Sequence, residues 1–198
     1  MNLPNKISLA RILMIPAFVL IFFLDFKYNY VVAAAIFAIA ALTDFVDGKI
    51  ARSRNLVTNL GKFLDPIADK VLVSTAFILL LTLKDELFGF LDGATNAVYV
   101  AVVICICVIM ARELIISAFR QVAAAAGVIL AAEKLGKYKT FAQDVCLVVF
   151  FVAADLSGVA NVIVSGVALG IFVIATVLTV ISGCSYVLKH KKVLTEAN

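Results

Sequence analysis

The chain has 198 residues, of which 64% are hydrophobic and 15% are charged, whereas about 25% of the residues of an ordinary soluble domain carry a charge. This composition excludes a typical soluble globular domain and indicates a membrane protein. The net charge of +4 suits anionic lipid or anionic substrates better than nucleic acid, because the basic residues are spread along one predicted membrane face.

Six apolar stretches follow one another, and each is long enough, or nearly so, for a helix that crosses a hydrocarbon core, which needs about 20 residues. We expect an all-α, polytopic membrane protein with six transmembrane helices in a single domain over residues 1–198. Before the first helix, "NLPNKISLARI" is predicted to be an amphipathic lead-in that lies on the membrane surface. The predicted helices cover residues 8–24, 30–48, 66–83, 96–120, 140–156 and 160–188.

The distribution of basic residues predicts the orientation of these helices. Of the 17 Lys and Arg residues, Lys27 and Lys84 lie in the first and third loops, and the others lie at the N-terminus, in or toward the second and fourth loops and on the tail. Cytoplasmic flanks carry the excess of Lys and Arg. We therefore expect a multi-pass protein of the cell (inner) membrane with both termini cytoplasmic.

Four aspartates interrupt the apolar sequence where the second predicted helix ends and the third begins. Asp44 and Asp47 are three residues apart, and Asp65 and Asp69 are four apart, so each pair projects from one helix face. Pro66 fits the first turn of the third helix. Ionised carboxylates at a membrane boundary need cations between them. Four oxygen ligands without Cys or His indicate two Mg²⁺ or Mn²⁺ ions.

An alternative is that these aspartates cap helix ends and pair with nearby basic residues. This alternative suits one or two of the aspartates better than all four at this spacing. Gly48 and Gly61 also argue against it, because glycine is a poor helix former and lets a ligand approach the backbone closely. The basic residues available for such pairs are Lys49, Arg52, Arg54, Lys62 and Lys70.

The whole pattern of the region reads Asp44-x2-Asp47-Gly48-x2-Ala51-Arg52-x8-Gly61-x3-Asp65-x3-Asp69. It resembles the complete signature of the CDP-alcohol phosphotransferase family, with no departure from it. Three further stretches, "LPNKISLARILMIP", "ARELIISAFR" and "LGKYKTFAQ", extend the resemblance over most of the chain. These stretches are similar to bacterial members of the family that use glycerol 3-phosphate as the acceptor.

The resemblance implies an enzyme, active on the cytoplasmic side, that transfers the phosphatidyl group of CDP-diacylglycerol to glycerol 3-phosphate with two divalent ions. It also implies a homodimer. By position, Asp44, Asp47 and Asp65 would bind metal, and Asp69 would bind metal and act as the general base. The residues implied for the CDP-lipid site are Gly48, Ala51, Arg52, Thr58 and Gly61, with Asn5 and Ser8 from the lead-in.

Basic and hydroxyl groups near the fourth and fifth predicted helices are candidates for the acceptor phosphate: Arg112, Arg120, Lys137, Lys139 and Thr140. Arginine suits bidentate phosphate contact. For Lys137 and Lys139 the alternative is topological anchoring on the cytoplasmic face. For Arg112, a charge within an apolar stretch, functional use is the first hypothesis, and an ion pair with Glu113 is the alternative.

Two other functions remain as alternatives. A sibling enzyme of the same family would use inositol phosphate, serine or phosphatidylglycerol as acceptor, and the aspartate signature does not separate these. A cation-coupled transporter would place its acids near the bilayer midplane, in broken helices, whereas these aspartates lie at helix ends.

Small residues of the later helices indicate packing. The four cysteines lie in apolar segments without metal-ligand spacing, and we expect them to be packing residues. Gly166 and Gly170 form a small-xxx-small pair, which predicts a close helix seam either inside the chain or in a dimer.

Overall fold

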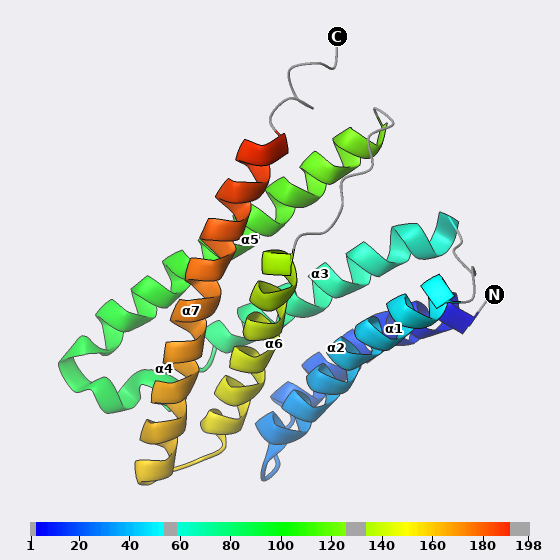
Figure 1. Cartoon of the computed structure of the whole chain (residues 1–198). Coiled ribbons are helices and arrows are strands. Elements are labelled where there is room, and N and C mark those ends of the chain that lie inside the picture. Colours follow the sequence, from blue (N-terminus) through cyan, green and yellow to red (C-terminus); the bar gives the residue numbers. More distant parts are fainter. Residues whose placement is uncertain (1–2, 54–58, 126–133, 191–198) are drawn as a thin grey trace. The chain divides into compact units, whose positions relative to one another are not determined.

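A computed structural model describes residues 3–53, 59–125 and 134–190, with side chains in 9–43, 67–124 and 135–189. All elements in these ranges are helical (Figure 1). A short helix, α4 (Lys84–Phe88), and a 3-10 helix, η1 (Gly89–Ala94), connect two of the longer helices. The longer helices are α1 (Leu3–Phe23), α2 (Asn29–Ser53), α3 (Asn59–Leu81), α5 (Thr95–Ala125), α6 (Lys134–Ala154) and α7 (Gly158–His190).

The prediction of an all-α protein is confirmed for the described residues, because each of the six predicted stretches corresponds to one long helix, with ends that differ by a few residues. Two stretches, Lys84–Ala124 and Gly158–Lys189, are long and apolar enough to cross a membrane. The apolar helical stretches Leu9–Phe23 and Asn29–Thr43 are shorter. Six membrane spans therefore stay a prediction.

The expected surface lead-in is not a separate element. α1 begins at Leu3 and continues without interruption to Phe23, so the lead-in and the first apolar stretch form one helix. Pro4 lies in the first turn of α1, where its missing N–H would have no helical partner. Pro16 lies inside the helix and removes one backbone hydrogen bond there.

The prediction for the polar loop between the second and third helices is also wrong, because it made the loop too long. α2 continues past Gly48 to Ser53, and α3 already begins at Asn59. Pro66 therefore lies in the interior of α3 rather than in its first turn. The apolar pattern covers only part of each helix, whereas the helical backbone of α2 continues through good helix formers such as Lys, Ala and Arg.

The chain forms two compact units. Unit 1 consists of Met1–Phe90 and Leu147–Ala168, and unit 2 of Leu91–Cys146 and Leu169–Asn198. α6 passes from unit 2 into unit 1, and α7 passes from unit 1 into unit 2. The single domain over 1–198 stays a prediction.

In unit 1, α1 packs against α2 and α3, and α2 packs against α3; Figure 1 shows α1 and α2 side by side. Buried aromatic rings join α1 to α2 and to the end of α6. The ring centroid of Phe18 lies 5.9 Å from that of Phe37 and 5.8 Å from that of Phe151. Aromatic pairs at this distance contribute about 0.5–1.5 kcal/mol beyond the area that they bury.

Polar contacts tie the N-terminus of α2 to the turn between α6 and α7, also within unit 1. The backbone N–H of Val31 donates to Asp155 Oδ2 at 2.7 Å, which satisfies one of the unpaired donors of a helix N-terminus. Asn161 Nδ2 donates to the carbonyls of Ala153 and Glu86 at 2.8 and 2.9 Å. The contact at Val31 lies about 20 Å along α2 from Asp44, at 1.5 Å per residue.

Unit 2 brings α5 together with the first part of α6 and the later part of α7. The rings of Phe119 and Tyr186 pack edge to face at 6.0 Å. Gln143 Nε2 donates to Thr179 Oγ1 at 3.0 Å, and both side chains are buried. A hydrogen-bonded amide in an apolar unit fixes the register of α6 against α7, because a slip would leave buried polar groups without partners.

The glycine pair of α7 does not form a seam inside the described part of the chain. A Cβ atom at Gly166 or Gly170 would meet no other described atom within 4 Å. At Gly183, by contrast, a Cβ atom would meet a side chain of α5 closely. The close approach of α7 to a neighbour therefore occurs at a glycine that the spacing rule did not select.

Candidate functional site

The signature residues lie on α2 and α3 of unit 1, which pack against each other. The helical backbone keeps the spacing of three and four residues within each aspartate pair, so each pair occupies one helix face. Thr58 lies outside the described residues. The signature and lead-in positions with a described helical backbone, but with side chains outside the described set, are Asn5, Ser8, Asp44, Asp47, Gly48, Ala51, Arg52, Gly61 and Asp65.

Asp69 is the signature carboxylate whose side chain is described, and it is half-buried on α3 beside the fully buried Ala68. Among the described side chains, no three His, Cys, Asp or Glu residues converge; the other three signature aspartates do not belong to that set. The donor set itself fits a hard divalent cation, since four carboxylates offer only oxygen ligands.

Arg11 brings a buried positive charge to the start of the signature. Its side chain, on α1, is fully buried, and its Nε donates to Thr43 Oγ1 at 3.5 Å. Thr43 directly precedes Asp44. A buried guanidinium is stable only near anionic or hydrogen-bonding groups, and the Thr43 hydroxyl is one such group. Sequence reasoning missed Arg11, although it lies within "LPNKISLARILMIP".

In unit 2, one carboxylate bridges two cations from different helices. Arg112 Nη1 and Glu113 Oε1 on α5 lie 3.1 Å apart, and Lys139 Nζ on α6 donates to the same oxygen. The exposed fractions of the three side chains are 15%, 25% and 5% in that order. The ion pair of Arg112 with Glu113, an alternative from the sequence, is confirmed, and Lys139 joins it.

α7 contacts the guanidinium of Arg112 as well. Arg112 Nη2 donates to Ser182 Oγ at 3.0 Å, and the Ser182 hydroxyl donates to the Thr179 carbonyl at 3.1 Å. A Cβ atom at Gly183 would lie 2.9 Å from Arg112 Cγ and 3.1 Å from its Nε. Only a residue without a side chain allows this approach. Sequence reasoning missed Ser182 and Gly183, because the contact joins residues 70 positions apart.

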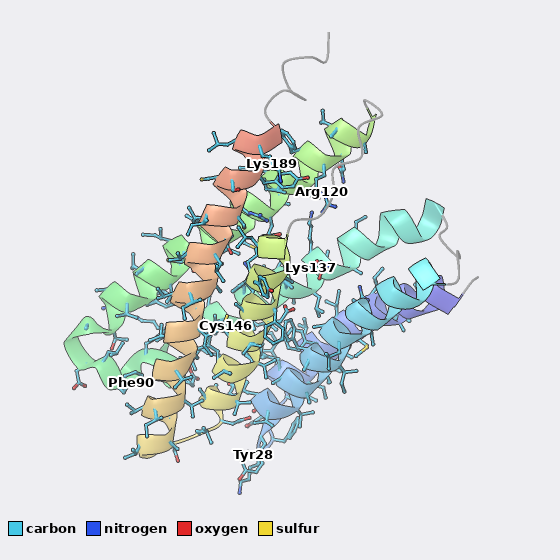
Figure 2. All side chains as sticks on the ribbon, viewed as in Figure 1. Tyr28, Phe90, Arg120, Lys137, Cys146 and Lys189 are labelled. Carbon is cyan, nitrogen blue, oxygen red and sulfur yellow. The ribbon has the colours of Figure 1, made fainter. Side chains whose placement is uncertain are left out.

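The other predicted acceptor residues lie outside this cluster of contacts. Arg120 and Lys137 are exposed, and Figure 2 labels Arg120 near Lys189, and Lys137 between Arg120 and Cys146. The Thr140 hydroxyl donates to the Gly136 carbonyl at 3.1 Å, so it must leave that bond to donate to a ligand. The structure thus brings together Arg112 and Lys139 and leaves the other three candidates apart from their shared carboxylate.

A family model described as CDP-alcohol phosphatidyltransferase matches residues 1–181. The chain belongs to the CDP-alcohol phosphatidyltransferase family. This match confirms the resemblance that the aspartate signature indicated. Membership of this family, together with two apolar helices of membrane-spanning length, supports association with a membrane.

Curated relatives match nearly the whole chain. A protein of Bacillus subtilis (strain 168) is 36% identical over 220 residues, covering 100% of this chain and 99% of the relative. Proteins of Rickettsia typhi and Salmonella paratyphi A are each 38% identical, over 185 and 187 residues, covering 93% of this chain and 94% and 92% of the relatives. Each of the three is named CDP-diacylglycerol--glycerol-3-phosphate 3-phosphatidyltransferase.

Proposed function

We propose that the protein transfers the phosphatidyl group of CDP-diacylglycerol to glycerol 3-phosphate, which gives phosphatidylglycerophosphate and CMP. The observation that carries this proposal is the similarity to the enzymes of that name over nearly the full length of both chains. The unbroken signature on α2 and α3 supports the donor half of the reaction. The buried Lys139 and the partly buried Arg112 of unit 2 support an acceptor that carries a phosphate.

On the donor side, Asp44, Asp47, Asp65 and Asp69 would hold two Mg²⁺ or Mn²⁺ ions, which when bound neutralise the pyrophosphate and improve CMP as a leaving group. Asp69 accepts the proton of the attacking glycerol hydroxyl. The hydroxyl oxygen bonds to the lipid-linked phosphorus as the bond from that phosphorus to the CMP oxygen breaks. The CDP moiety is lined by Gly48, Ala51, Arg52, Thr58 and Gly61, with Asn5 and Ser8 from α1.

On the acceptor side, Arg112 and Lys139 bind the phosphate of glycerol 3-phosphate. Both are buried enough to make strong charge-assisted hydrogen bonds, and the planar guanidinium of Arg112 can offer two donors to one phosphate. Arg120, Lys137 and Thr140 would contribute from the edge of this site. The two exposed cations would mainly attract the anionic acceptor, since exposed charges are screened by salt.

We place the enzyme in the inner membrane with six spans, and with both termini and the active site on the cytoplasmic side. The acyl chains of the donor then stay in the bilayer while its headgroup reaches the aspartates at the ends of the apolar stretches. A homodimer is expected from the family resemblance.

Release of CMP by the purified protein from CDP-diacylglycerol, with a panel of acceptors, tests the proposal. Glycerol 3-phosphate should support release, whereas glycerol, serine and inositol phosphate should do so poorly. Excess chelator should stop release, and Mg²⁺ or Mn²⁺ should restore it. A higher rate with serine or inositol phosphate would assign the sibling activity, and no release with any acceptor would contradict an enzyme of this family.

A further inference from the structure

We propose that Glu113 is the resident anion of the acceptor site. Its carboxylate pairs with Arg112 and Lys139 while no acceptor is bound, and it competes with the phosphate of the incoming acceptor for these two cations. This inference rests on the proposed function, because it takes these two cations as the phosphate site. It adds a specificity-determining residue that belongs to neither the signature nor the predicted acceptor residues.

The charges of the cluster support a competition. Two cations share the single carboxylate of Glu113, so the three side chains together carry one positive charge. A phosphate monoester carries about 1.5 to 2 negative charges at pH 7. The phosphate balances the two cations if the carboxylate turns away, and it meets a like charge at the same donors if the carboxylate stays. Like charges at such distances in a partly buried site repel strongly.

The contacts show which of the three side chains is free to turn. Lys139 is 5% exposed and Arg112 is 15% exposed. Arg112 is also held by Ser182 and by the close approach at Gly183. Glu113 is the most exposed of the three, at 25%. It is therefore the least enclosed of the three side chains and the one with the most room to turn once a phosphate has taken over its donors.

Arg112 also has a donor to spare for a ligand. A guanidinium has five N–H groups. Arg112 Nε is buried, and among the described residues no hydrogen-bond partner of this atom is found. The contacts with Glu113 and Ser182 therefore do not saturate this guanidinium, which leaves hydrogen-bonding capacity for a phosphate with several acceptor oxygens.

The carboxylate of Glu113 would also let the site discriminate between acceptors by their charge. An acceptor displaces Glu113 only if it brings at least as much negative charge to the same donors. A phosphate monoester does so, whereas glycerol has no charge and serine brings one carboxylate with an ammonium. Glu113 thus favours a phosphorylated acceptor by excluding weaker ones, in addition to the attraction of the cations.

Inorganic phosphate is a probe of this competition that needs no turnover. The full-length protein in detergent is titrated with phosphate while its unfolding temperature is measured, since a ligand of the folded state stabilises it in proportion to its occupancy. The variants are Glu113→Gln, Lys139→Met and, as a matched control, Glu86→Gln, which removes an exposed carboxylate of α4 in unit 1.

Without phosphate, Glu113→Gln should unfold at a lower temperature than the wild type, because two partly buried cations lose their counter-ion. Its phosphate affinity should rise at least about tenfold, the change that corresponds to about 1.4 kcal/mol. The apparent KM for glycerol 3-phosphate should fall with it, while that for CDP-diacylglycerol stays the same. Lys139→Met should weaken phosphate binding, and Glu86→Gln should leave it unchanged.

Unchanged or weaker phosphate binding by Glu113→Gln would overturn the proposal, because Glu113 would then only orient the cations. So would unchanged phosphate binding by Lys139→Met, since the probe would then report another site. If Glu113→Gln does not fold, Glu113→Asp replaces it. This side chain keeps the charge but is too short to bridge both cations, so phosphate should bind more tightly than to the wild type, and unchanged binding would again contradict the proposal.

The outcome is separable from that of the proposed function. If the wild type releases CMP with glycerol 3-phosphate but Glu113→Gln does not bind phosphate more tightly, only the resident-anion proposal fails. If another acceptor is preferred but the phosphate titrations follow the expected order, the proposed function fails and the competition at these cations stands.

Discussion

The signature carboxylates and the cations of unit 2 are positioned in different ways. The aspartates lie in pairs three and four residues apart on α2 and α3, so helix geometry alone places each pair on one face. Arg112 and Lys139 come from α5 and α6, and they meet through Glu113. Ser182 and Gly183 of α7 also contact Arg112. The acidic pairs depend on local backbone, whereas the cation pair depends on tertiary packing.

This difference implies a separation of donor and acceptor binding. A substitution at Gly183 changes the contacts of Arg112, whereas the spacing within each aspartate pair is set by α2 or α3 itself. Variants of Arg112, Lys139 and the α7 residues that contact Arg112 should therefore change the KM for the acceptor. Variants of the signature should change turnover or the KM for the CDP-lipid. The predictions below test this separation, from the largest expected effect to the smallest.

Asp69→Asn should reduce turnover by at least about 10²–10⁴-fold, the usual range for a lost general base, and its proposed metal role adds to the loss. Binding of CDP-diacylglycerol should stay largely intact. Steady-state CMP release and an equilibrium lipid-binding measurement check both expectations. Asp92→Asn, in the exposed part of η1, is the control. A near-normal rate for Asp69→Asn would assign the base to another group.

Lys139→Met should raise the apparent KM for glycerol 3-phosphate about ten- to hundredfold, since a hydrogen bond to a charged group contributes about 1.5–3 kcal/mol. Lys137→Met is the matched control, because it is the same change two residues away at an exposed position, and its effect should be much smaller. Arg52→Gln should instead raise the KM for CDP-diacylglycerol. If both lysine variants keep a normal KM for glycerol 3-phosphate, the two residues are topological anchors.

Gly183→Ala should raise the KM for glycerol 3-phosphate about tenfold, because the new Cβ would displace Arg112 from its hydrogen bonds, worth about 1.5–3 kcal/mol each at full loss. Gly170→Ala on the same helix has open space around it and gains the same helix propensity of about 1 kcal/mol. The difference between the two variants isolates the contact with Arg112. If the two variants have the same KM for glycerol 3-phosphate, the contact of Arg112 with α7 is not needed for acceptor binding.

Asp155→Asn should lower the free energy of unfolding by about 0.3–1 kcal/mol, the usual contribution of a negative charge at a helix N-terminus, because the side chain that accepts from Val31 loses its charge. Turnover at a permissive temperature should stay normal. Thermal unfolding in detergent measures the change, and Asp85→Asn at an exposed position of α4 is the control. A loss of activity without a loss of stability would show that Asp155 has a role beyond the cap.

The sequence was sufficient for features that depend on local spacing. The aspartate signature identified the family, and the lengths of the apolar stretches predicted the helices. Helix ends were less predictable, because polar residues with good helix propensity extend α2 to Ser53 and start α3 at Asn59. Pro66 was misplaced for the same reason.

The contacts of the acceptor residues could not be predicted from spacing. Glu113 and Lys139 are 26 residues apart, and Arg112 and Ser182 are 70 apart, so their meeting depends on how three helices pack. By residue type alone, Thr140 and Lys139 were equal candidates for binding the acceptor phosphate. The Thr140 hydroxyl, however, donates a hydrogen bond to a carbonyl of its own helix. Gly183 carries no sequence signal that separates it from Gly170; only the neighbouring side chain does.

The cap on α2 has a consequence for the time course of synthesis. Val31 and Asp155 are 124 residues apart, so at about 5–20 residues per second the ribosome adds the capping carboxylate roughly 6–25 s after the residue that it caps. Phe151, which packs on Phe18 and Phe22, arrives just as late. The nascent chain must therefore hold α1, α2 and α3 with an uncapped helix end and an incomplete aromatic core until α6 has been made. Premature termination before residue 147 would leave unit 1 permanently in that state.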